Sequence, residues 1–219
     1  EWTLVTIVVD VTGSVQSFKD KLLDCLKTII KACHKNQRAE NLMVRVLTFN
    51  EDVHEIHGFM SLPDIDVNDY KAFNPAGMTN LHEAVYNSIG ATLEYGKHLV
   101  DQDLDVNGCV YIITDGCHNH GSMTAFQIAK LMEDTNKSEE YFSLLSVLVG
   151  LNEPGNLDGD VVKALEDFTK EAKLTEYVDL GDATSQRLAK LANWVSQSVS
   201  SQSQAIQTGS PVASQPLSF

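Results

Sequence analysis

Five oxygen-bearing side chains have the types and the placing expected of ligands for a metal ion: Asp10, Thr12, Ser14, Thr79 and Asp115. The first three follow an apolar run near the start of the chain, Thr79 precedes a helical pattern, and Asp115 follows a second apolar run. Two carboxylates and three hydroxyls are hard ligands, which suit a divalent cation such as Mg²⁺, with Mn²⁺ or Ca²⁺ as alternatives. The five can act together only if three separate loops converge on one point.

The strands and helices around these residues predict that convergence. Continuous β-branched and apolar runs at 3–9 and 108–114 are typical of strands buried on both faces of a parallel sheet. Apolar side chains recur at helical spacing over 15–35, and a further helix is expected at 80–99. Because such sheets bind ligands at the carboxyl ends of their strands, the five residues fall where a binding site is expected.

The order of elements predicts an α/β protein with a Rossmann-like, doubly wound, mostly parallel sheet of six strands and helices on both faces. A short polar turn at 50–52 joins strands 43–49 and 53–59 into an antiparallel hairpin, which we expect at one edge of the sheet. The remaining elements are expected as a helix at 123–133, a strand at 143–149, a helix at 160–172, a short strand around Tyr177 and a helix at 182–199.

The end of the chain differs in composition from the rest. From about Ser196, small and amide residues dominate and no charged residue occurs, which is typical of a flexible linker or tail. We therefore expect one domain over 1–199 and a Ser/Gln-rich tail over 200–219. A tail of this composition cannot fold alone, so we expect it to dock onto a neighbouring subunit through Leu217 or Phe219, in a homo- or hetero-oligomer.

Composition restricts the class of partner. The 219 residues carry a formal net charge of -14, whereas phosphate binding needs clustered Lys and Arg, so nucleic acid and anionic membranes are disfavoured. No apolar run approaches the roughly 18 residues of a membrane span. Cys25 and Cys33 lie on one expected helix and Cys109 in a strand, which indicates reduced thiols and a cytoplasmic location. The chain begins with Glu1 rather than Met, which leaves the native N-terminus open.

In order and spacing, residues 3 to about 199 resemble a von Willebrand factor A (vWA) domain with its metal-ion-dependent adhesion site. The family pattern Asp-x-Ser-x-Ser is matched at Asp10, Thr12 and Ser14, with Thr in place of the first Ser, and the distant Thr and Asp are matched by Thr79 and Asp115. The resemblance implies that Thr12 and Ser14 bind the ion directly, Thr79 directly or through water, and the two carboxylates often through water. Thr12 keeps the hydroxyl but adds a methyl group.

The resemblance also implies recognition rather than catalysis, because in this family a Glu or Asp of a partner protein completes the coordination of the ion. We therefore predict a non-catalytic, divalent-metal-dependent protein-interaction module, with His118 and His120 on the partner-facing surface. Two alternatives are a structural or assembly subunit in which the metal is incidental, and a vWA subunit that accompanies a ring-forming ATPase.

Other interpretations of the same residues have less support. An Asp after a strand, a Thr before a helix and Asp-Gly after a strand are each common turn or cap chemistry, so none alone indicates a metal. The run 117–120, Cys-His-Asn-His, could contribute to a zinc site but lacks a partner pair at finger spacing. An EF-hand-like opening at 103–108 has Thr114 where the bidentate Glu is required. No nucleotide-binding motif occurs, and Thr12 replaces the second Asp of dehalogenase-like phosphatases.

Overall fold

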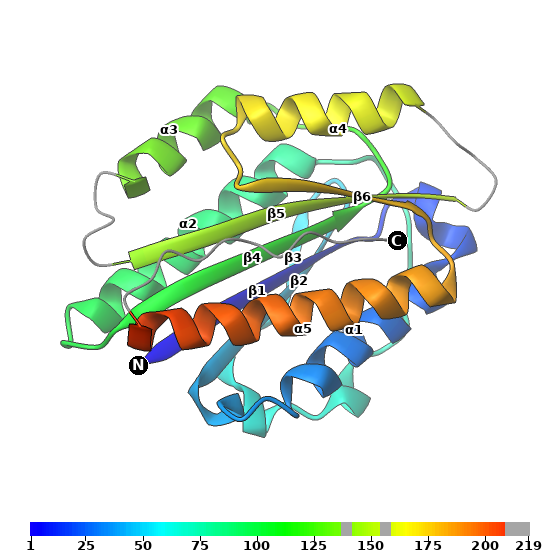
Figure 1. Cartoon of the computed structure of the whole chain (residues 1–219). Helices are drawn as coiled ribbons and strands as arrows, with labels where there is room; N and C mark the ends of the chain where they lie inside the picture. The colour runs from blue at the N-terminus through cyan, green and yellow to red at the C-terminus, as the bar shows by residue number, and fades with distance from the viewer. Residues whose placement is uncertain (137–141, 154–158, 209–219) are drawn as a thin grey trace.

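The computed structural model describes residues 1–136, 142–153 and 159–208. Its strands form one sheet in the order β3-β2-β1-β4-β5-β6 (Figure 1). Neighbouring strands are parallel except β2 and β3, which pair antiparallel at one edge, so the predicted fold class is confirmed. The strands are β1 (Trp2–Asp10), β2 (Leu42–Phe49), β3 (Val53–Ser61), β4 (Val106–Thr114), β5 (Phe142–Asn152) and β6 (Glu176–Asp182).

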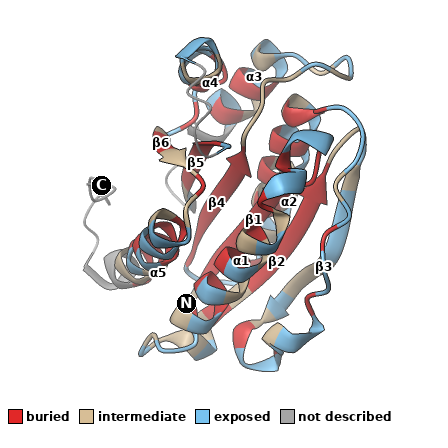
Figure 2. Cartoon of the chain, turned by 90° about the vertical axis from the view of Figure 1, so that its right-hand side faces the viewer, coloured by how far each residue is buried: buried red, intermediate tan, exposed pale blue. Residues whose placement is uncertain are grey.

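Helices cover both faces of the sheet. Helices α1 and α5 pack on one face, and α2, α3 and α4 pack on the other (Figures 1 and 2). None of the helices in the described ranges combines the length and the apolarity that a membrane crossing requires. The α-helices are α1 (Lys19–Cys33), α2 (Leu81–Val100), α3 (Ala125–Asn136), α4 (Gly159–Glu171) and α5 (Ser185–Thr208), and short 3-10 helices occur at η1 (Gly13–Ser17), η2 (Ala39–Asn41), η3 (Leu62–Asp64) and η4 (Val67–Asp69).

Strand β1 shows how the sequence builds a core on each face. Successive side chains of a strand point to opposite faces, so Val5, Ile7 and Val9 join the core under α1 and α5, while Val8 joins the core under α2. β1 pairs with β2 on one side and β4 on the other, and it is buried from its second residue to its last (Figure 2). Its carboxyl end, at Asp10, is therefore held on all sides by neighbouring elements.

The edge strand β3 pairs irregularly with β2. The register shifts between Val44 and Val46 and again between Val46 and Leu47. Across the first shift, two steps along β2 correspond to three along β3, since Val44 pairs with Met60 and Val46 with His57. Each extra residue is a bulge, which bends the strand and interrupts its hydrogen-bond ladder.

Helix α5 is longer than the sequence predicts. We expected it to end near Val199 and a flexible tail to follow, but it continues to Thr208. The prediction ended too early because the Ser- and Gln-rich composition of this segment is also compatible with a helix whose polar groups find partners. The rest of the predicted tail, including Leu217 and Phe219, lies outside the described residues.

Hydrogen bonds from neighbouring elements attach the added turns of α5. Asn107 on β4 donates from Nδ2 to the Gln202 carbonyl (2.6 Å), and Arg38 donates from Nη1 to the Ser203 carbonyl (2.8 Å). The side chains of Gln202 and Ser203 are buried. These contacts place α5 as far as Ser203 within the folded unit and explain how a segment with few apolar residues is held there.

The contact between Asn107 and α5 can be tested by substitution. Asn107→Ala removes the donor, so the carbonyl of the buried Gln202 loses this hydrogen bond. We expect the free energy of unfolding to fall by about 1–3 kcal/mol, measured by urea denaturation. The exposed Asn74→Ala serves as the control and should change it by less than about 0.5 kcal/mol. Equal stability of the two variants would mean that α5 is not anchored at this point.

Candidate metal centre

Asp10 lies at the carboxyl end of β1 and is 1% exposed. Its Oδ1 accepts a hydrogen bond from the Thr12 backbone N–H (2.8 Å), and its Oδ2 accepts one from the Thr114 hydroxyl at the end of β4 (2.5 Å). One carboxylate therefore joins the loop after β1 to the end of the neighbouring strand.

A chain of hydrogen bonds continues from this loop to the loop after β4. The Thr12 hydroxyl lies 3.0 Å from the Ser14 hydroxyl, which donates to Oδ1 of Asp115 (2.8 Å). Residues about a hundred positions apart in the sequence thus meet at one edge of the sheet. Four of the five predicted ligands, Asp10, Thr12, Ser14 and Asp115, are linked in this way.

Thr79 lies on a third loop, directly before α2, and is 4% exposed. Its N–H donates to Oδ1 of Asn119 (2.7 Å), and the Asn119 N–H donates back to the Thr79 carbonyl (3.0 Å). Its hydroxyl lies against Gly116, 3.6 Å from where a Cβ would stand, and makes no hydrogen bond within the described residues. The Thr79 hydroxyl therefore lies beside the loop of Asp115 but makes no hydrogen bond to it.

Without a cation, the ionised forms of Asp10 and Asp115 are disfavoured. Burial raises the pKa of Asp10, although hydrogen bonds from Thr114 and Thr12 partly oppose this. Burial, followed by the charge of Asp10, raises the pKa of Asp115 to about 7. A nearby positive charge would offset both causes, so the electrostatics of the site favour a cation.

Three aromatic rings stack beside the site. The rings of His82 and His118 are stacked almost parallel, with 3.7 Å between their centroids and an interplanar angle of 3°. The other neighbour of His82 is the Phe168 ring from α4, at 4.5 Å. The stack connects the start of α2, the loop after β4 and α4, so it supports two of the three loops that carry the predicted ligands.

His118 caps helix α2 from another loop. Its Nδ1 accepts the His82 backbone N–H (3.3 Å), which is one of the N–H groups that a helix leaves without a partner in its first turn. Gly121, at φ +96°, allows the same loop to lie against Asn80, because a Cβ there would stand 2.4 Å from Oδ1 of Asn80. His118 is thus engaged within the protein, whereas His120 is half-buried on the same loop.

Sequence reasoning missed the residues that position the predicted ligands. Thr114, Asn119 and His82 hold the three loops together through side-chain hydrogen bonds. Their types, a hydroxyl, an amide and an imidazole, are common in loops, and only the fold shows which partner each one meets.

No group of three or more His, Cys, Asp or Glu side chains in the described part of the chain is placed to hold a metal ion. The run 117–120 therefore does not assemble a zinc site of that kind. The candidate centre differs from such a group because three of its five side chains carry hydroxyls.

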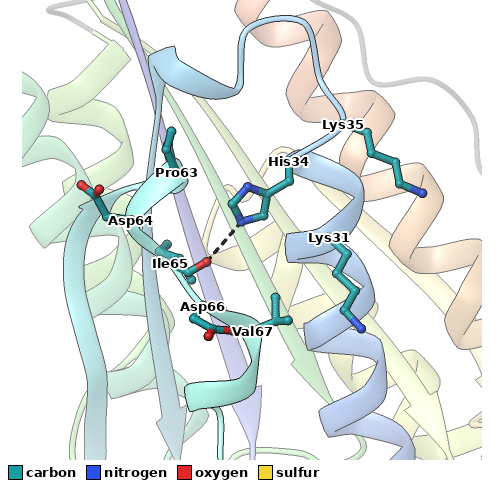
Figure 3. A pocket seen from close by; sticks show the side chains of 8 residues that line it. All are labelled: Lys31, His34, Lys35, Pro63, Asp64, Ile65, Asp66 and Val67. Atoms are coloured by element: carbon teal, nitrogen blue, oxygen red, sulfur yellow. Dashed lines mark hydrogen bonds between the residues drawn. The ribbon is translucent and has the colours of Figure 1, made fainter.

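Open cavities also occur away from these loops. One of about 550 Å³ lies between the end of α1 and the segment 63–67 (Figure 3). The His34 ring extends toward that segment, with Nε2 3.3 Å from the Ile65 carbonyl, whereas Lys31 and Lys35, from the same helix end, point away from it and are exposed to solvent. The charged groups that line it are Lys31 and Lys35 at the helix end and Asp64 and Asp66 on the facing segment.

Comparison with known proteins shows the fold. No protein-family model and no curated protein matches the sequence. Solved structures do match: the PilB minor pilin from Streptococcus sanguinis has a TM-score of 0.66 at 14% identity, over 96% of this chain and 63% of that one. An aerotolerance-related membrane protein from Bacteroides fragilis has a TM-score of 0.54 at 16% identity, over 94% and 99%.

A third match is proximal thread matrix protein 1 from the mussel byssus, solved with a zinc-occupied MIDAS motif. Its TM-score is 0.58 at 18% identity, over 91% of this chain and 46% of that one. The fold is therefore vWA-like, and the chain spans less than two thirds of the pilin and less than half of the byssus protein. These pilus and byssus matches give no support to the expected cytoplasmic location.

The stacked imidazoles predict a pH dependence of stability. Burial lowers the pKa of both His82 and His118, so the unfolded chain binds protons near pH 6.5 that the folded protein does not. This pair therefore destabilises the fold progressively as pH falls below about 6.5. We expect His118→Asn, which keeps an acceptor at this position, to lose part of that dependence in urea unfolding at a series of pH values.

The comparison with wild type isolates the imidazoles. In the metal-free protein, the raised pKa of Asp115 acts in the opposite direction, stabilising the fold as pH falls below about 7, and it is present in both proteins. The informative quantity is the difference in unfolding free energy between the two proteins. A difference that does not change with pH would show that the stack carries no proton linkage.

Proposed function

We propose that this protein is a non-catalytic recognition module that binds a divalent cation at the carboxyl ends of β1 and β4 and, through it, a carboxylate of a partner protein. The observation that carries the proposal is the position of Asp10 and Asp115, two carboxylates of raised pKa, beside hydroxyl groups from the loop after β1 and from the loop before α2. Without a cation, this arrangement disfavours the ionised form of both carboxyl groups.

The donor set fits Mg²⁺ in its chemistry. Thr12, Ser14 and Thr79 would supply neutral oxygens, and Asp10 and Asp115 would supply two negative charges. The Thr79 hydroxyl makes no hydrogen bond in the described structure, so it is available as a ligand. When bound, the ion would supply an electrophilic centre for a partner carboxylate.

The surroundings of the site also suit a protein partner. Met78, next to Thr79, is 46% exposed, and Phe126, in the first turn of α3, is 76% exposed. Of these two residues, Met78 is adjacent in sequence to a predicted ligand, and Phe126 follows the loop after β4. Together with His120, we assign them to the partner-facing surface, whereas His118 supports the loop from within.

The proposal can be tested before a partner is known. Mn²⁺ added to the chelator-treated protein should bind, and the water-proton relaxation enhancement of the complex reports water exchange at the ion. N-acetylglutamate methylamide, a probe for a partner Glu, should lower that enhancement by displacing water. The isosteric N-acetylglutamine methylamide should not, because it lacks the charge. Mg²⁺ should compete with Mn²⁺ for the site.

Matched variants identify the residues responsible. Ser14→Ala and Asp115→Asn should each weaken Mn²⁺ binding at least tenfold, a loss of about 1.4 kcal/mol, in isothermal calorimetry. Ser17→Ala and Asp101→Asn make the same chemical changes at exposed positions outside the site and should bind as wild type does. Full Mn²⁺ affinity in Asp115→Asn, or equal effects of the glutamate and glutamine probes, would refute the proposal.

Metal binding should also release a proton near neutral pH. The pKa of Asp115 is about 7 in the metal-free protein, and a cation favours the ionised carboxylate. We therefore expect the apparent metal affinity to fall by about tenfold for each pH unit below 7 if one proton is released. Calorimetry in buffers of different ionisation enthalpy counts the protons, and a count of zero at pH 6 would contradict this assignment.

A further inference from the structure

A second open cavity, of about 460 Å³, lies between the edge strand β3 and the second half of α2. Helix α2 begins beside Thr79 and runs away from the candidate metal centre, so the cavity residues Glu94, Tyr95 and His98 lie toward its far end. The volume is within the range of small-molecule binding sites.

A buried arginine forms part of the cavity wall. Arg45, on β2, is 8% exposed, donates from Nε to Glu55 (2.5 Å) and donates from Nη2 to Oδ1 of Asn87 (3.2 Å). Its Nη1 is buried and has no hydrogen-bond partner among the described residues. A guanidinium has five N–H donors, and only Nε and Nη2 of Arg45 have one partner each within the described residues, so Nη2 has a second N–H for a ligand of the cavity that Arg45 lines.

An aromatic wall stands beside the arginine. Phe59 of β3 and Tyr95 of α2 stack with 4.8 Å between ring centroids, and both line the cavity. Each ring is only partly buried. Ring faces carry a partial negative charge, which attracts the weakly positive C–H groups of a flat ligand.

The charges around the cavity restrict the ligand. Arg45 is already paired with Glu55, and Glu94 adds a further exposed carboxylate on α2. The surplus negative charge disfavours an anion, and the guanidinium disfavours a cation placed against it. A neutral ligand that both donates and accepts hydrogen bonds fits the donor Arg45 and the acceptors Glu55 and Glu94.

We propose that this cavity binds a carbohydrate, a neutral polyhydroxylated ligand, at a site separate from the candidate metal centre. The hydroxyls of the sugar accept hydrogen bonds from Arg45 and donate to Glu94. The C–H face of the sugar ring lies on the Phe59–Tyr95 pair. Polar groups on one side and aromatic rings on the other thus match the two kinds of surface that a pyranose presents.

The test uses methyl glycosides of glucose, galactose, mannose and N-acetylglucosamine with the full chain in saturation-transfer difference NMR. At least one should bind with a dissociation constant of about 1 mM, the weak affinity expected of a single sugar. Amide shift changes should map to 55–59 and 91–98, and addition of EDTA should leave binding unchanged.

Surface variants keep the test independent of folding. Tyr95→Leu should weaken binding at least tenfold and Glu94→Gln severalfold, whereas Glu40→Gln, the same change at a remote exposed position, should have no effect. Arg45→Met should abolish binding, with the retained fold checked by its amide spectrum.

Absence of binding by all four glycosides, or binding unaffected by Tyr95→Leu and Glu94→Gln, would overturn the proposal. Preferential binding of N-acetyllysine methylamide at these residues would do so too, by showing a site for cationic peptides.

Discussion

The buried carboxylate of Asp10 is the interaction on which the rest of the site depends. A carboxylate that is 1% exposed is unstable without strong hydrogen bonds, and Asp10 finds them in the Thr12 backbone and the Thr114 hydroxyl. One bond determines the path of the loop after β1, and the other connects that loop to the end of β4. Because β1 is buried between β2 and β4, Asp10 cannot move without disturbing the centre of the sheet.

The remaining loops are held by residues other than the predicted ligands. Asn119 exchanges two hydrogen bonds with the backbone of Thr79, and His118 caps α2 while its ring stacks on His82. The support therefore comes from backbone groups and imidazoles. This leaves the Thr79 hydroxyl unengaged within the described structure, as a ligand position requires. At Thr79, the backbone groups hold the loop and the hydroxyl takes no part in doing so.

The sheet and the meeting of the three loops could be predicted from the sequence because both follow from strong local patterns. Runs such as 3–9 and 108–114 identify buried parallel strands, and residues at their carboxyl ends come together by topology alone. The end of α5 could not be predicted, since Gln202 is buried through a main-chain bond from the distant Asn107.

The burial of Arg45 could not be predicted from the sequence either. In the strand 43–49, a single charged residue gives no indication of whether it faces solvent or a neighbouring helix. Its partners come from β3 and from α2, so they are decided by the register of one strand pair and the placing of one helix. Local patterns predict which segments form strands, whereas side-chain partners depend on contacts between segments far apart in the sequence.

The two register shifts of β3 have a consequence for the behaviour of the protein at high concentration. A straight edge strand presents a regular row of unpaired N–H and C=O groups, to which the edge strand of another molecule can pair. In β3 the bulges at this edge break that row, and the strand bends away from a flat ladder. The sheet is thereby protected from extension on this side. Any assembly that includes this protein at this edge has to form through loops, helices and side chains rather than through a continuous sheet.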